Sequence, residues 1–256
     1  NGKAISKVFG KKRVEAISIC EHKDSGKGNE KIACDCIAMS GGWSPVVHLY
    51  SHCGGKLKWD EKMALFKPDS SAKPTSHDGL PFVTAVGSAN GFLLMQEVLK
   101  DAREGCLEVV EASGGKVKKE SFKLIEQEYE NSLEAIWIAP QDADIKKRSK
   151  IWLDFQNDVK INDVELAARE GFESVEHTKR YTTLGMATDQ GKLSNINGLA
   201  ILSSSLGKEI PKVGTTTFRP PYTPISLGSI GGSARGELFQ PVRKTPMHDW
   251  HENNGA

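Results

Sequence analysis

The chain has 256 residues, of which 38% are hydrophobic and 26% are charged, and its formal net charge is +1. This balance is typical of a globular protein, and the small net charge excludes a strong electrostatic attraction to nucleic acid or to an anionic membrane. No apolar run approaches the roughly 20 residues that span a bilayer.

Five scattered cysteines, of which only Cys34 and Cys36 lie close together, favour reduced thiols and a cytoplasmic protein over a disulfide framework. The chain starts with Asn1 and ends on RKTPMHDWHENNGA, which resembles the start of a further segment. We therefore expect the chain to be part of a longer polypeptide.

The first 106 residues alternate between strand-like and helix-like patterns. RVEAISIC (13–20) alternates with a period of two, and KIACDCIAMSGG (31–42) runs apolar into a glycine pair. Ser44 and Pro45 favour a helix start, and PFVTAVGS (81–88) predicts a strand before a helix that Gly105 would end. Strand, glycine turn and helix, repeated twice, predict an α/β sheet with ligands at the ends of its strands.

The remaining chain changes character twice. Residues 107–150 are mixed and indicate a linker with possible strands, whereas 158–207 have a helical period. In that module Asn162 and Ser174 are expected to cap two helices, and Gly207 to end a third. Six of the eleven prolines then follow between Pro211 and Pro246, which predicts an extended connector.

Two glycine turns are candidate dinucleotide contacts. Gly41 and Gly42 follow one predicted strand, and Gly87 and Ser88 end the other. Backbone N–H groups at such turns favour a pyrophosphate, although a plain turn has the same sequence pattern. The chain contains no G-x-G-x-x-G fingerprint.

The loop KRYTTLGMATDQGKLS (179–194) and the run TTTFR (215–219) are basic and rich in hydroxyls. Arginine and threonine side chains suit a phosphate dianion. A hydroxyl network that caps the helices explains the same residues equally well.

Three sets of residues have metal-ligand chemistry, but none has a further partner at suitable spacing, so we expect no metal site. They are Cys34 with Cys36; His48, His52 and Cys53; and His248 with His251. No residues indicate a serine, histidine and acid triad, and the basic runs 116–119 and 146–150 are interpreted as solvated surface.

Three stretches closely resemble the α subunits of heterotetrameric sarcosine oxidases. They are DFQNDVKINDVELAAREGFESVEHTKRYTTLGMATDQGKLSNINGLAIL, GTTTFRPPYTPISLG and FQPVRKTPMHDWH. ACDCIAMSGGWSP and FVTAVGSANG resemble the second half of a FAD/NAD-type domain, with Ser88 where related flavoproteins carry aspartate. The resemblance therefore implies NAD rather than FAD in this domain.

The helical module is similar to small [2Fe–2S] modules of bacterioferritin-associated ferredoxin and related amine dehydrogenases. Their C-x-C and C-Q-G-x-x-C cysteines fall on Asp154, Gln156, Asp189 and Ser194 of this chain. These side chains do not hold such a cluster, so the resemblance implies a helical module without one.

The resemblance implies an oxidoreductase acting on CH–NH donors, with β, γ and δ partner subunits and no catalytic residue in this chain. Such a complex demethylates sarcosine to glycine, passes the methyl carbon to tetrahydrofolate and reduces O2, using FAD in β and FMN between α and β. The chain alone is expected to be inactive. An N-methylglutamate dehydrogenase-like subunit and a non-catalytic scaffold are the alternatives. The residues expected at the FMN phosphate are Arg180, Thr182, Thr183, Lys192, Thr216 and Arg219.

The expected organisation has four parts. They are residues 1–106, the C-terminal part of an NAD-binding α/β domain; 107–150, a linker; 151–207, the helical module; and 208–256, a connector with the start of an aminomethyltransferase-like domain.

Overall fold

The computed structural model describes residues 2–28, 30–117, 134–240 and 242–255. It divides into two compact units, one up to Tyr222 and one from Thr223 onward. In the described residues the strands are β1 (Lys3–Phe9), β2 (Ala16–Glu21), β3 (Glu30–Ala33), β4 (Leu57–Asp60), β5 (Leu65–Pro68), β6 (Trp152–Asp154) and β7 (Val159–Lys160). The helices are α1 (His48–His52), η1 (Gly87–Asn90), α2 (Met95–Ala112), α3 (Ile145–Arg148), α4 (Ile161–Arg169), α5 (Val175–Thr182), α6 (Asn195–Leu206), α7 (Ile210–Val213), α8 (Leu227–Gly231), η2 (Gly236–Leu238) and α9 (His248–Asn253).

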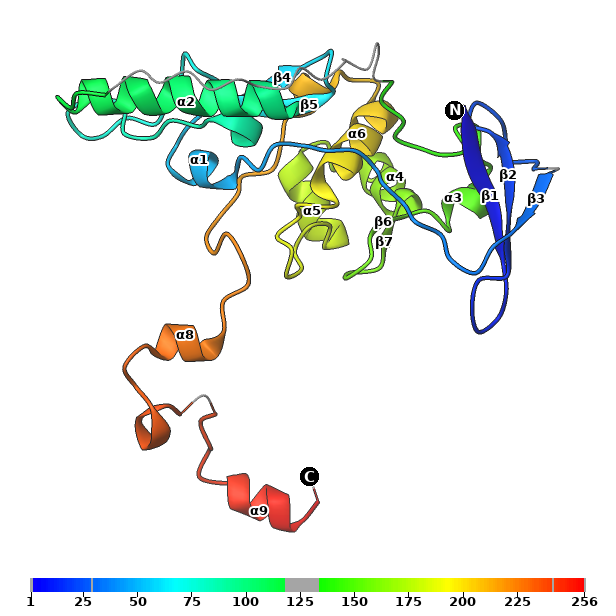
Figure 1. The fold of residues 1–256 in the computed structure, drawn as a ribbon. Coiled ribbons are helices and arrows are strands. Elements are labelled where there is room, and N and C mark those ends of the chain that lie inside the picture. The colour runs from blue at the N-terminus through cyan, green and yellow to red at the C-terminus, as the bar shows by residue number, and fades with distance from the viewer. Residues whose placement is uncertain (1, 29, 118–133, 241, 256) are drawn as a thin grey trace. The chain divides into compact units, whose positions relative to one another are not determined.

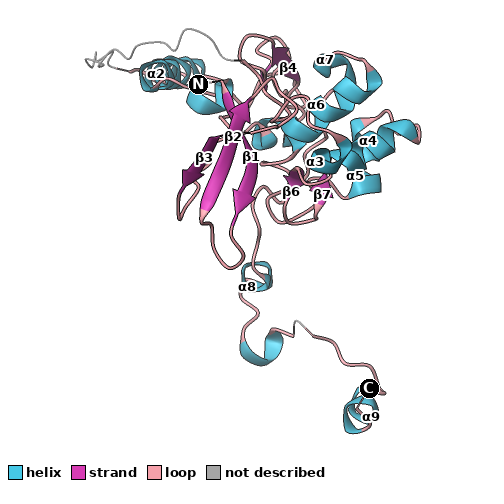
Figure 2. Ribbon diagram, turned by 90° about the vertical axis from the view of Figure 1, so that its right-hand side faces the viewer, coloured by secondary structure: helices cyan, strands magenta, loops and turns pink. Residues whose placement is uncertain are grey.

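The first unit opens with a three-stranded antiparallel sheet in the order β1-β2-β3 (Figure 2). The predicted alternation over 13–20 appears in β2, where Ala16, Ser18 and Cys20 are buried on one face. Lys147 on α3 donates hydrogen bonds to the carbonyls of Ser25 and Gly26, at 2.8 and 2.5 Å. These bonds tie α3 to the loop between β2 and β3.

A second part of this unit contains the β4–β5 hairpin, η1 and α2. The strand predicted over 81–88 is not formed, because this segment makes only an isolated bridge between Thr75 and Pro81. Proline has no amide proton to donate to a ladder. The mixed α and β character is confirmed, but every strand pair in the described ranges is antiparallel.

Two helix boundaries differ from the sequence prediction. The helix expected from Ser44 begins only at His48, after the β-branched pair Val46–Val47, which disfavours helix. The helix expected to end at Gly105 continues to Ala112. Gly105 is buried inside α2, where an added Cβ would lie 2.4 Å from Val86 Cγ1, so close packing explains this glycine.

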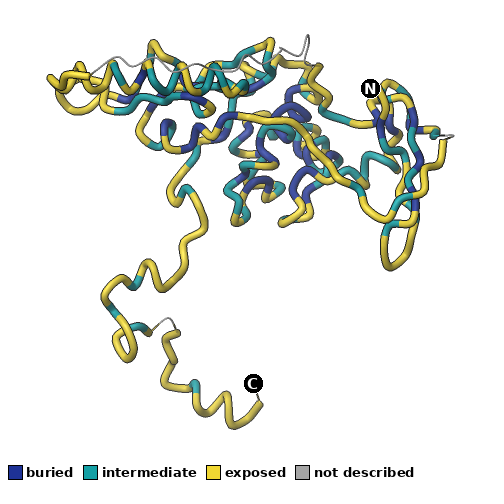
Figure 3. Tube along the Cα trace, in the orientation of Figure 1, coloured by how far each residue is buried: buried dark blue, intermediate teal, exposed yellow. Residues whose placement is uncertain are grey.

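The core of the first unit lies in the helical module, where α4 packs against α5, α6 and the strand β7 (Figure 1). The buried residues, drawn in dark blue, are concentrated on these helices (Figure 3). Ser174 and Gly207 stand at the predicted helix ends, although the Ser174 side chain makes no cap hydrogen bond. Asn162 lies inside α4 instead of capping it, since the Asp163 carboxylate accepts the Lys160 amide at 2.8 Å.

The predicted linker contains the end of α2 and the short helix α3, and no strand within 107–117 or 134–150. Residues 118–133, which include most of the basic run 116–119, lie outside the described residues. The predicted connector splits between the units, because 208–222 belongs to the first.

The second unit has no buried residue in its described part. It carries the short elements α8, η2 and α9, in the range where the sequence predicted an extended connector and the start of an aminomethyltransferase-like domain. Exposed apolar side chains such as Ile230, Leu238 and Trp250 lie along it. No helix in the described part of the whole chain is long and apolar enough to cross a membrane.

Candidate functional site

Asp154 connects the β6–β7 hairpin to the loop after α5. Its side chain is buried, and Oδ2 accepts the Gly185 amide at 2.8 Å while Oδ1 accepts the Gln156 and Asn157 amides at 2.9 and 3.1 Å. A carboxylate that accepts several backbone N–H groups is a strong local anchor. Asp154 thus fixes both the turn of the hairpin and the start of the loop.

Of the other three positions where the resembling modules carry cysteines, Gln156 and Asp189 accept hydrogen bonds from this loop, whereas the buried Ser194 hydroxyl has no partner among the described residues. Gln156 Oε1 accepts Thr188 Oγ1 at 2.6 Å and the Thr188 amide at 3.1 Å. Asp189 accepts the amides of Gly191 and Leu193 at 3.2 and 3.1 Å. In the described structure, oxygen acceptors therefore hold this loop in place.

A basic cavity of about 250 Å³ opens between α5, this loop and the run after α7. Three cations line it, Lys179, Arg180 and Arg219, with the single carboxylate of Glu176. The remaining lining residues are His48, Gly185, Met186, Gln190, Thr217 and Phe218. The excess of positive charge suits an anion.

Glu176 organises one wall of the basic cavity. Its Oε1 accepts the Thr217 amide at 2.6 Å, and its Oε2 lies 3.3 Å from Arg180 Nη1. Arg180 is thus partly neutralised, whereas neither Lys179 nor Arg219 makes an ion pair or side-chain hydrogen bond to any described residue. Lys179 and Arg219 are the cations free to meet a ligand.

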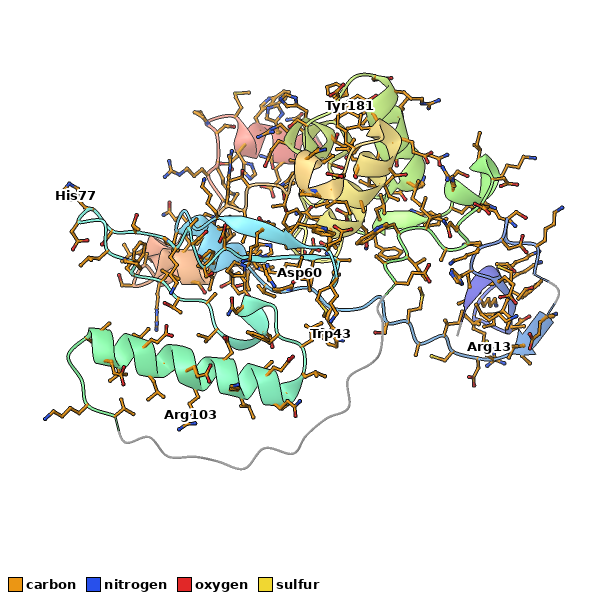
Figure 4. The ribbon with its side chains drawn as sticks, turned by 90° about the horizontal axis from the view of Figure 1, so that it is seen from above. Arg13, Trp43, Asp60, His77, Arg103 and Tyr181 are labelled. Carbon is orange, nitrogen blue, oxygen red and sulfur yellow. The ribbon has the colours of Figure 1, made fainter. Side chains whose placement is uncertain are left out.

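An apolar cavity of about 310 Å³ shares two wall residues, His48 and Phe218, with the basic cavity. Its walls include Trp43, Phe66 and Leu199. Trp43 is 81% exposed and lies on the irregular segment between β3 and α1 (Figure 4). This cavity suits an uncharged, flat or apolar group.

His48 is buried at the wall between the two cavities, with only 6% of its surface exposed. Its ring lies 3.8 Å from the Phe218 ring, centroid to centroid. Burial, followed by the positive charge of Lys192, lowers the pKa of His48 to about 4. The imidazole is therefore neutral at pH 7.

The structure gathers two of the six residues predicted for the phosphate, Arg180 and Arg219, in the basic cavity. Lys192 lines the apolar cavity instead, and its ammonium donates to the Tyr222 carbonyl. The predicted threonines serve the fold. Thr182 donates to the Thr178 carbonyl at 2.7 Å, Thr183 to the Thr182 carbonyl at 2.6 Å, and Thr216 accepts Asn195 Nδ2 at 2.9 Å.

The residues predicted for NAD are not brought into one cavity of the described structure. Gly41 and Gly42 are exposed, and Gly42 alone lines the apolar cavity. The Gly87 amide already donates to Asp101 Oδ2 at 2.6 Å, and Ser88 is exposed. The Asp101 carboxylate on α2 thus already accepts the hydrogen bond that the Gly87 amide would donate to a pyrophosphate.

Sequence reasoning missed His48, Glu176 and Phe218 as cavity residues. The sequence does contain one indication of the cavity, because His48 lies inside an apolar run with Val46, Val47 and Leu49. From the sequence alone, His48 is a candidate only as a metal ligand. Among the described residues, His48, His52 and Cys53 do not form a group of three metal ligands. His248, Asp249 and Glu252 do place their ligand atoms within 4.8 Å of one another, at a largely exposed position.

Comparison with known proteins confirms the predicted resemblance. Residues 148–234 match the family described as the sarcosine oxidase A3 domain. The chain is 41% identical over 252 residues to sarcosine oxidase subunit alpha of Rhizobium meliloti (strain 1021), a match covering 97% of this chain and 24% of that protein. It is 36% identical over 240 residues to the Corynebacterium sp. (strain U-96) subunit alpha, covering 92% and 24%. The chain thus spans about a quarter of these relatives.

Similarity to solved structures includes an enzyme of known fold. The crystal structure of L-proline dehydrogenase from P. horikoshii superimposes with a TM-score of 0.63 and 18% sequence identity, covering 88% of this chain and 43% of that chain. At this identity the similarity concerns the fold alone.

Proposed function

We propose that this chain forms part of the α subunit of a flavin-dependent sarcosine oxidase complex. The observation that carries the proposal is the 41% identity over 97% of the chain with a sarcosine oxidase subunit alpha. The proposed reaction of the complex is oxidative demethylation of sarcosine to glycine at a CH–NH bond. The methyl carbon passes to tetrahydrofolate, and O2 is the final acceptor.

The role proposed for this chain is to hold the phosphate of FMN at an interface with a β subunit. The basic cavity supports this role, because Lys179 and Arg219 face it without partners among the described residues. Arg219 offers a forked donor to phosphate oxygens, and Glu176 fixes the neighbouring Thr217 backbone. FMN, when bound, supplies an electron acceptor for the FAD proposed in the β subunit.

The residues present do not fit a closed NAD site. The Gly87 amide is taken by Asp101, and the other glycines lie apart from it in the described structure. No step of the proposed function therefore involves NAD in this chain.

The proposed assembly contains β, γ and δ subunits and is cytoplasmic. The proposed division of the chain follows the sequence: an α/β part to 106, a linker to 150, the helical module to 207 and a connector beyond. The five cysteines are all free, as a reducing compartment requires.

A scaffold role is the second candidate, and one observation favours it. Three of the four positions that carry thiolates in the resembling modules, Asp154, Gln156 and Asp189, accept hydrogen bonds from the loop before α6 here. These bonds support a module that keeps its fold without a cluster. A scaffold subunit would bind its partners without contacting flavin.

The test is native mass spectrometry of the complex purified through this polypeptide, combined with flavin analysis. We expect a hetero-oligomer that carries FMN and FAD, and a lower FMN content when Arg219 is replaced by alanine. His77→Asn, on an exposed loop, serves as the control (Figure 4). A hetero-oligomer with FMN content unchanged by Arg219→Ala would support the scaffold role.

A further inference from the structure

Among the described residues that line the cavities, His48 and Asn195 have buried side-chain atoms without a hydrogen-bond partner, and only His48 lines both cavities and lacks a partner at two atoms. Neither Nδ1 nor Nε2 has a hydrogen-bond partner with standard geometry in the described residues, although the side chain is more than nine-tenths buried. Leaving a buried polar group without a partner destabilises the fold, so such a group in a native protein calls for a bound water, a ligand or a function.

The position of the ring shows where a partner would come from. Phe218 covers one face of the imidazole at 3.8 Å, and the Tyr222 ring lies edge-on at 6.2 Å. Aromatic side chains thus occupy two approaches to the ring, and its two buried nitrogens meet no partner with standard geometry among the described residues. His48 lines both cavities, and the basic cavity also holds the unpaired cations Lys179 and Arg219.

The groups around His48 act on its pKa in both directions. After burial, Lys192, on the loop before α6, has the largest lowering effect, and His52, on α1 itself, lowers the pKa further. The Gln190 backbone, which is placed to accept a hydrogen bond from the ring, and the Asp189 carboxylate raise it. In the basic cavity three cations face one carboxylate, and that carboxylate is already bonded to Arg180 and Thr217.

We propose that His48 is a binding residue for a phosphate monoester. Its imidazole donates a hydrogen bond to a phosphate oxygen in the basic cavity, and it takes up a proton from solvent as the anion binds. A dianion next to the ring replaces the field of the surrounding cations with one that favours imidazolium. This inference rests on the proposed function, since it assigns a new residue and a proton to the same phosphate site.

The experiment uses the full 256-residue chain and three probes: FMN, inorganic phosphate, and riboflavin, which has no phosphate. Dissociation constants are measured by calorimetry and flavin fluorescence for the wild-type chain, His48→Phe, His48→Asn and Arg219→Ala. Phenylalanine keeps the ring packed against Phe218 but has no hydrogen-bonding nitrogen. His77→Asn is the matched control, because His77 lies on an exposed loop (Figure 4).

We expect His48→Phe to weaken binding of FMN and of phosphate about tenfold or more, which corresponds to about 1.4 kcal/mol. Riboflavin should bind with the same dissociation constant to the wild-type chain and to His48→Phe. In the wild-type chain, NMR titration of the imidazole should show the pKa of His48 rising by about one unit or more when phosphate is added. The NMR readout needs no variant, so it decides the matter even if a His48 variant fails to fold.

The outcomes separate the two proposals. If the wild-type chain binds neither FMN nor phosphate, the phosphate site is overturned and this inference with it. If both bind and Arg219→Ala weakens them, while His48→Phe and the pKa of His48 show no change, the proposed site stands and the role of His48 is overturned.

Discussion

The Asp154 carboxylate and the Gly185 amide, 31 residues apart in sequence, are joined by a buried hydrogen bond of 2.8 Å. Asp154 stands at the first position where the resembling iron–sulfur modules carry a thiolate. The bond joins the β6–β7 hairpin to the loop that leads into α6. An internal carboxylate thus links the hairpin to the loop.

Replacing Asp154 by alanine should therefore destabilise the helical module. The amides of Gly185 and Gln156 would lose their acceptor, at a cost of about 1–3 kcal/mol in the free energy of unfolding. Urea denaturation followed by circular dichroism measures the change. Asp142→Ala is the control, because Asp142 is exposed. Equal stability of the two variants would show that the bond does not anchor the loop.

Much of the helical module was predictable because its signals are local. The apolar period of α6, Ser174 before α5 and Gly207 after α6 are set by neighbours within one or two turns. The β4–β5 hairpin was missed, because the residues between its strands, Glu61–Ala64, include no glycine, asparagine or proline.

The site itself was less predictable because it depends on distant residues. The burial of His48 arises from packing against Phe218, 170 positions later, which no local pattern reports. The threonines at 182, 183 and 216 matched a phosphate site in composition, but the backbone and Asn195 use their hydroxyls. Composition identifies hydrogen-bonding capacity and not whether the fold has already used it.

Gly105→Ala should destabilise the chain even though alanine favours helix. The substitution gains about 1 kcal/mol of helix propensity, but overpacking of a tight contact costs about 1–3 kcal/mol. The new Cβ would lie 2.4 Å from Val86 Cγ1. Removing that methyl group in the double variant Val86→Ala/Gly105→Ala should recover part of the loss. Thermal unfolding of the wild-type chain, the two single variants and the double variant measures these changes. A Gly105→Ala variant that is more stable than the wild-type chain would contradict the close contact.

His48 should make stability depend on pH in the absence of ligand. The pKa of His48 is lowered from 6.5 to about 4 in the folded chain, so the unfolded chain binds more protons between these values. The contribution of the neutral His48 ring to the free energy of unfolding is therefore fully present above about pH 6.5, and it is lost as the pH falls toward 4. The loss is on the order of 3 kcal/mol. Urea unfolding between pH 7.5 and 4.5 should show a steeper decline for the wild-type chain than for His48→Phe. Parallel curves would mean that the ring is not held neutral.

Glu176 has two effects on the basic cavity, and two substitutions separate them. Glu176→Gln removes the negative charge but keeps an acceptor for the Thr217 amide, so phosphate should bind about threefold more tightly, given the modest energies of partly exposed charge pairs. Glu176→Ala also removes the acceptor and frees the Thr217 backbone, so it should bind phosphate less tightly than the glutamine variant. Calorimetry with inorganic phosphate measures both. Glu173→Gln, whose carboxylate pairs with Lys208 outside the cavity, should leave the affinity unchanged. Weaker binding by Glu176→Gln than by the wild-type chain would show that the carboxylate assists the anion and would contradict the charge argument for this cavity.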